Sequence, residues 1–157
     1  MRATRRALRP GDLLVLSGPE PPIGVFWALV QSHPDDPLWV FGVPVTQYPF
    51  LGVDDVAIEA TGRFGTLKGG GHCGLGLWLR AGAIRTAGLK RRVAGRIRPR
   101  DLKGVRARLH DLATGGGPWV QVPLFVSETE DSADYRDWMS QVDRVRGNLE
   151  ACMAGTP

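Results

Sequence analysis

The chain has 157 residues, of which 43% are hydrophobic and 23% are charged, which is the composition of one globular domain and not of a disordered or fibrous protein. No apolar run reaches the roughly 18 residues of a membrane-spanning helix, and the basic N-terminus lacks the apolar segment of a secretory signal. We therefore expect a cytoplasmic protein in which residues 1–8 form a flexible arm. Cys73 and Cys152 are too few for a zinc framework or a disulfide scaffold, so neither a metal nor a cofactor is expected.

The formal net charge of +4 is spread unevenly along the chain. Residues 1–60 carry 4 basic and 7 acidic side chains, residues 61–112 carry 13 and 2, and residues 113–157 carry 3 and 7. The middle section is therefore strongly basic between two acidic sections. This pattern favours a polyanionic partner, either a nucleic acid or an acidic protein segment. The alternative is a solvated surface in an arginine-rich proteome.

Short apolar runs separated by turn signals predict strands over residues 13–16, 25–31, 38–45 and 56–60. Such short spacings favour a compact barrel or sandwich over alternating strands and helices. Residues 61–76 are rich in glycine and predict a mobile loop, after which residues 77–79 resume a strand.

Two amphipathic helices are predicted in the second half of the chain, which gives a mainly β fold with C-terminal helices (α+β). Pro99 suits a first helical turn, and one apolar stripe follows it at Leu102, Val105, Leu109 and Leu112. Residues 119–126 predict an edge strand, because Pro123 cannot donate to a ladder. A second helix is expected from residue 131 or 132. Its apolar side chains are Tyr135, Trp138, Met139, Val142, Val145 and Leu149.

Three local patterns do not support a cofactor or metal site. Residues 69–74 match G-x-G-x-x-G, but a dinucleotide site needs a strand before the glycines and a helix after them, and here a strand follows. His72 and Cys73 have no third metal ligand at short spacing. Asp54 and Asp55 fall in an expected turn, where solvated carboxylates are favoured over a metal site.

An ordered set of motifs resembles the MazF/PemK family of toxin ribonucleases. In chain order the motifs are RPGD at 9–12, GPE at 18–20, ALV at 28–30, VPVTQ at 43–47, IRT at 84–86 and GRIRPRDL at 95–102. The resemblance covers about residues 9–112. It implies a small SH3-like β-barrel, a homodimer, and metal-independent cleavage of single-stranded RNA.

The resemblance assigns a catalytic role to Thr46, but the arginine that the family uses falls on Val25 or Phe26 here. Cleavage through the 2′-hydroxyl needs a base, an acid and positive charge at the phosphate, and Thr46 cannot supply charge. The candidates for a substitute are Arg85, Arg63, Lys68 and His72. Arg85 could equally be structural, because the IRT segment packs next to the dimer interface in the family that this chain resembles.

The expected RNA contacts are Gln47, which follows Thr46, and basic side chains of the middle section: Arg63, Lys68, Arg80, Arg91, Arg92 and Arg96. The missing arginine leaves open a catalytically silent protein of the same fold that binds nucleic acid or an acidic antitoxin. A structural barrel with no role in nucleic-acid binding is a third possibility. The acidic extension over residues 113–157 either completes the core or covers part of the basic face.

Overall fold

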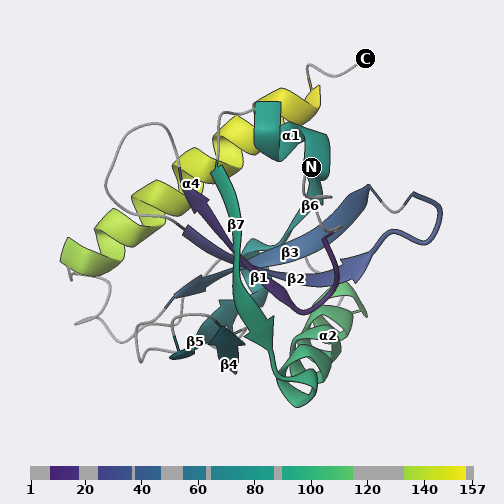
Figure 1. Cartoon of the computed structure of the whole chain (residues 1–157), viewed down its shortest axis with the longest axis vertical. Helices are drawn as coiled ribbons and strands as arrows, with labels where there is room; N and C mark the ends of the chain where they lie inside the picture. Colours follow the sequence, from purple (N-terminus) through teal and green to yellow (C-terminus); the bar gives the residue numbers. More distant parts are fainter. Residues whose placement is uncertain are drawn as a thin grey trace, which may run out of the picture.

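Seven strands and three α-helices make up the part of the chain that the computed structural model describes, which is residues 8–17, 25–36, 38–46, 55–62, 65–86, 90–114 and 133–154 (Figure 1). The strands are β1 (Asp12–Ser17), β2 (Val25–Ser32), β3 (Trp39–Thr46), β4 (Asp55–Gly62), β5 (Gly65–His72), β6 (Leu77–Arg80) and β7 (Lys90–Ile97). The helices are η1 (Cys73–Leu75, a 3-10 turn), α1 (Ala81–Thr86), α2 (Pro99–Thr114) and α4 (Ala133–Ala154).

Six of the strands close into an antiparallel barrel. The hydrogen-bonded order is β2-β1-β7-β4-β5-β3, and β3 pairs back onto β2. The other edge of β3 is shared, because residues 39–42 pair with β6 and residues 45–46 pair with β5. This architecture confirms the expected fold class, a small, mainly β SH3-like barrel with C-terminal helices.

The first three strands bury side chains on both of their faces. Leu13 belongs to the cluster inside the barrel, whereas Leu14 and Leu16 belong to a second cluster on its outer surface. On β2, Ala28 likewise belongs to the interior cluster and Trp27 to the outer cluster. A strand that is buried on both faces needs an unbroken apolar run, which is why these strands could be recognised in the sequence.

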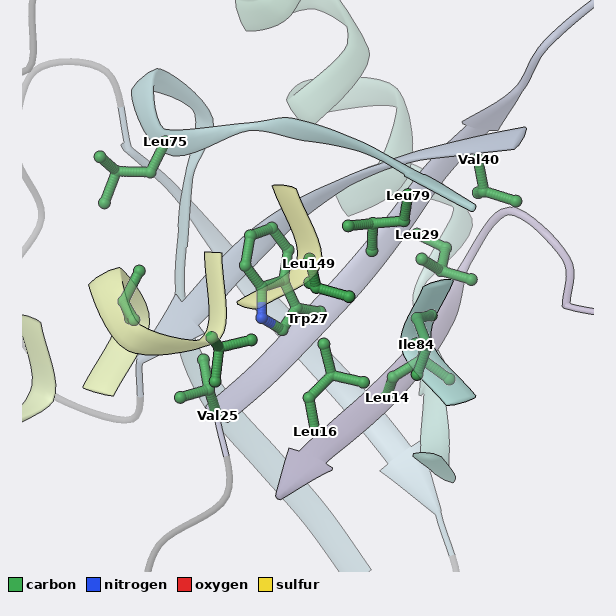
Figure 2. Close-up of a cluster of buried hydrophobic side chains, with 12 residues drawn as sticks. Leu14, Leu16, Val25, Trp27, Leu29, Val40, Leu75, Leu79, Ile84 and Leu149 are labelled. Atoms are coloured by element: carbon green, nitrogen blue, oxygen red, sulfur yellow. The ribbon is translucent and has the colours of Figure 1, made fainter. Parts of the chain in front are cut away.

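Helices α2 and α4 cover different sides of the barrel (Figure 1). Val105 of α2 is fully buried in the interior cluster, near Ile58 and Val43. On the outer surface, Val142, Val145 and Leu149 of α4 pack against the cluster around Trp27, whose ring lies beside this helix in Figure 2. The helix of the C-terminal extension is therefore part of the hydrophobic core. The edge strand expected over residues 119–126 lies outside the described residues.

The prediction of a mobile loop over residues 61–76 is wrong, because this segment contains the end of β4, all of β5 and η1. Gly69, Gly70 and Gly71 offer no side-chain pattern, yet all three pair with β4, and Gly70 and Gly71 also pair with β3. Strand β7 and the short helix α1 were not predicted either. Strand β7 is rich in basic residues and is held by pairing with β1. In these segments, backbone pairing overrides weak local propensity.

We expect Leu149→Ala to lower the free energy of unfolding by about 2–5 kcal/mol, because it opens a cavity beside Trp27. The neighbouring exposed residue provides the control, and Asn148→Ala should change stability by less than about 0.5 kcal/mol. Urea denaturation of both variants measures the difference. Equal midpoints would show that α4 is not part of the cooperative core.

Two glycines allow the backbones of β4 and β7 to touch. A Cβ atom on Gly95 would lie 2.6 Å from the carbonyl oxygen of Thr61, and a Cβ atom on Gly62 would overlap the carbonyl oxygen of Ala94. We therefore expect Gly62→Ala to destabilise the fold by about 2 kcal/mol or more, since the strands must separate.

Gly147 lies inside α4 with open space around its Cα atom, so it is the matched position for the same substitution. Gly147→Ala should stabilise the fold by up to about 1 kcal/mol through helix propensity. Opposite shifts of the thermal midpoint are the expected result. A shift of the same sign in both variants would contradict the close contact between β4 and β7.

Candidate functional site

Thr46, the residue that the sequence analysis placed at the catalytic centre, is the last residue of β3. It pairs with Gly70 of β5, and it is only 4% exposed. Val43 and Val45 point into the barrel, so the alternation of a strand directs Thr46 to the outer face. The neighbouring Gln47 lies outside the described residues.

An aspartate–histidine pair lies on the same face. The hairpin of β4 and β5 places Asp55 opposite His72, and Asp55 Oδ1 lies 3.0 Å from His72 Nδ1. Both side chains are less than a tenth exposed. The expectation that Asp55 is a solvated turn residue is therefore wrong: Asp55 begins a strand, and its carboxylate meets an imidazole.

The outer face of β5 places two polar side chains near Thr46. The inward direction of Gly71, toward Ile58 and Val43, puts Lys68, Gly70 and His72 on the outer side. Gly70 lies directly opposite Thr46, so Lys68 and His72 are its diagonal neighbours across the strand pair, with Cα atoms about 7–8 Å away. Lys68 is exposed. A hydroxyl, an imidazole and an ammonium group are thus brought together, and a carboxylate orients the imidazole.

This arrangement offers two of the groups that acid–base chemistry at a phosphate requires, a base and a positive charge. A carboxylate that accepts the Nδ1–H of a neutral histidine fixes the tautomer, and the lone pair is then on Nε2. A histidine in that state can accept a proton, a hydroxyl can donate a hydrogen bond, and an ammonium can neutralise charge. Thr46 and His72 are both buried, with exposed fractions of 4% and 5%.

Among the remaining predicted residues, the side chains that the structure describes are those of Arg80 and Arg96, and both make contacts elsewhere. Arg80, at the end of β6, lies over the ring of Trp39, with its Cζ atom 5.7 Å from the ring centroid. Arg85 is in α1, and Arg91 and Arg92 are on β7 opposite Leu16 and Val15, but their side chains lie outside what the structure describes. Arg63 is likewise outside the described residues.

Arg96, which the sequence predicted as an RNA contact, makes structural contacts within the barrel. Its Nη1 donates to Asp12 Oδ1 at 2.7 Å, and its Nη2 donates to the carbonyl oxygen of Pro10 at 3.0 Å. Asp12 is fully buried, and its other oxygen accepts the N–H of Arg9 at 2.9 Å. This ion pair joins β1 to β7, and it uses the guanidinium that the sequence analysis assigned to RNA.

A second ion cluster anchors the start of α2. Arg98 donates to Asp101 Oδ2 at 2.8 Å and lies 3.0 Å from Glu59 Oε2. The hydrogen bond to Asp101 raises the pKa of Arg98 above its ordinary value. Asp101 Oδ2 also accepts the N–H of Glu59 at 2.9 Å, so the helix start is fixed to β4. The sequence placed Asp101 at a helix start, but its contact with β4 could not be deduced.

We expect Arg96→Gln to lower the free energy of unfolding by about 1–2 kcal/mol, because the buried carboxylate of Asp12 loses its cation while the half-exposed guanidinium is partly screened. Lys103→Gln, on the exposed side of α2, should change it by less than about 0.5 kcal/mol. Chemical denaturation compares the two variants. Unchanged stability together with lost RNA affinity would assign Arg96 to RNA alone.

Comparison with known proteins gives no relative: no protein-family model, no curated protein and no solved structure matches this chain. Across the described ranges, no cluster of three or more histidine, cysteine, aspartate or glutamate side chains is arranged to hold a metal ion. None of the described helices combines the length and the hydropathy needed to cross a membrane. The fold is a six-stranded antiparallel barrel with C-terminal helices.

Proposed function

We propose that this chain is a metal-independent endoribonuclease of single-stranded RNA, a divergent relative of the MazF/PemK toxins. The observation that carries the proposal is the Asp55–His72 pair, which lies on the same face of the barrel as Thr46. The order of motifs in the sequence supports the family, and the basic middle section supports a polyanionic substrate.

In the proposed reaction, His72 Nε2 takes the proton of a 2′-hydroxyl, whose oxygen attacks the adjacent phosphorus. The bond between phosphorus and the 5′-oxygen breaks, and the departing oxygen takes a proton from water. His72 then returns the proton that it took to the solvent. The products are a 2′,3′-cyclic phosphate and a 5′-hydroxyl. Asp55 is a positioning residue, because it acts through the imidazole.

Thr46 and Lys68 stabilise the phosphate in this scheme. The Thr46 hydroxyl donates one hydrogen bond to a phosphate oxygen, and the Lys68 ammonium supplies the positive charge that the missing arginine would provide. Lys68 is exposed and lies diagonally across from Thr46, so its long side chain can reach a phosphate there. In this scheme Lys68 takes the place of the family arginine, whose position is occupied by Val25 or Phe26 in this chain.

The second candidate function is a catalytically silent protein that binds RNA or an acidic antitoxin. Two observations favour it. Val25, at one of the two positions where the family arginine would fall, is buried in the outer apolar cluster. Thr46 and His72 are both covered. A protein of this kind would bind single-stranded RNA without cutting it.

Cleavage of a single-stranded RNA in EDTA tests the proposal. We expect His72→Gln to lower the rate about 100-fold or more, and Thr46→Val to have an effect of similar size, because each loses an acid–base or electrostatic contribution. Asp55→Asn and Lys68→Gln should also slow cleavage. His110→Gln is the matched control, since this histidine is exposed on α2.

Circular dichroism of each variant shows whether it remains folded, and analysis of the RNA ends identifies the products. Cleavage that requires magnesium, or that persists in folded His72→Gln and Thr46→Val proteins, would contradict the mechanism. RNA binding without cleavage by the wild-type protein would select the silent alternative.

A further inference from the structure

An aromatic depression lies at the end of β3 opposite Thr46. It has a volume of about 510 Å³ and is lined by His33, Asp36, Trp39 and Trp78. Its walls come from the turn between β2 and β3 and from the neighbouring strand β6. Nothing in the candidate catalytic cluster uses these residues.

The rings of this depression are held in place by one another. Trp78 meets His33 edge to face, with ring centroids 5.5 Å apart, and it meets Phe41 at the same distance. Trp39 is paired with Arg80 across the two strands, and the guanidinium lies over its ring. The depression therefore presents two indole rings in fixed positions, with a cation at the edge.

The depression opens on the face of β3 and β6 that α4 does not cover. Val40 and Leu79, which are cross-strand partners, belong to the cluster under α4. Their neighbours Trp39, Trp78 and Arg80 therefore point to the opposite face.

Helix α2 brings further positive charge to this end of the barrel, because Arg106 donates from Nε to the carbonyl oxygen of Val30 at 3.0 Å. The exposed basic residues of this helix are Arg100, Lys103 and Arg106.

We propose that this depression is a base-stacking site for single-stranded RNA, an inference that rests on the proposed function. Aromatic rings combined with flanking cations are the features by which proteins hold single strands, since every base has a face that can stack. Arg80 would meet a phosphate. The Oδ1 atom of Asp36 accepts the N–H of Leu38 at 3.0 Å. The negative charge of Asp36 would repel a phosphate from the depression, and its carboxylate can accept a hydrogen bond from the exocyclic amino group of a base.

The charge at this site distinguishes RNA from other ligands of aromatic sites. A methylated ammonium group binds over an indole face, but Arg80 already lies over Trp39 and would repel it. A proline-rich peptide fits an aromatic groove, yet it gains nothing from the cations of Arg80 and α2. A polyanion whose bases stack uses both features.

The site is independent of the catalytic cluster. Trp39 and Thr46 are seven residues apart on β3, which separates their Cα atoms by about 23 Å, and they point to opposite faces. Substitutions at the two places should therefore affect RNA affinity additively. This separation allows the stacking site to be tested without touching the residues proposed for cleavage.

The experiment measures the affinity of a labelled RNA strand of about twelve nucleotides by fluorescence anisotropy. We expect Trp39→Ala and Trp78→Ala each to weaken binding about tenfold or more, and the corresponding phenylalanine variants to retain most of the affinity. Arg80→Gln should reduce the log–log salt slope by about 0.7. Val93→Ala, an exposed apolar position on β7, is the control and should change nothing.

A strand of the same length without bases separates stacking from charge, because the tryptophan variants should bind it as well as the wild-type protein does. If an alanine variant fails to fold, the quenching of tryptophan emission by RNA provides the second measurement, and Trp78→Phe should remove part of it. Folded alanine variants with unchanged affinity would overturn this inference alone.

Absence of RNA binding by the wild-type protein in dilute buffer would overturn the proposed function as well. A proline-rich peptide or a trimethyllysine peptide that displaces the RNA from this site would assign the depression to a protein partner and overturn the stacking proposal.

Discussion

The burial of β1, β2 and β3 on both faces determines where the other elements of this chain lie. Small side chains such as Ala28 and Val43 fill the inside of the barrel, while the large side chain of Trp27 lies on the outside. Each face needs its own cover, because apolar area left in water would cost the stability that its burial provides. The interior is completed by β4, β5, β7 and α2. The outer face is completed by α1 and α4, and Figure 2 shows Ile84 and Leu149 of these helices in the cluster around Trp27.

Strands β4 and β5 differ from β1 to β3, because they are apolar on one face only. The candidate site lies where β3 meets these two strands. Their inner faces are apolar, as Ile58 and Ala60 show, but their outer faces carry Asp55, Lys68 and His72. Thr46 is the last residue of β3 and faces this polar region. Strand β3, which is buried on both faces, thus ends beside polar side chains at the rim of the core.

Most of the fold could be predicted from the sequence, and so could three members of the candidate site, Thr46, Lys68 and His72, whereas Asp55 could not. Apolar runs predicted β1 to β3, and a stripe at helical spacing predicted α2, because in both cases side-chain burial creates the pattern. Strand β5 could not be recognised, since three consecutive glycines bury no side chain. Strand β7 could not be recognised because its basic residues interrupt any apolar pattern. Asp55 and His72 are seventeen positions apart and meet through the hairpin register. If β5 had been expected, counting residues outward from the Gly62–Gly65 pair along both strands would have placed Asp55 opposite His72.

The ring of strands is closed unevenly. Within the described residues, β4 and β7 share two residue pairs, Ala60 with Ile97 and Thr61 with Arg96, whereas β4 and β5 share eight. Beyond these pairs, the seam continues through Arg98, which bonds to Glu59 and Asp101 with its guanidinium half in solvent. Where few residue pairs join two strands, local opening of the sheet requires little free energy. Amide hydrogen exchange should thus be faster at this seam than along the β4–β5 ladder, and it should accelerate with ionic strength, because dissolved salt weakens the charges that extend the seam.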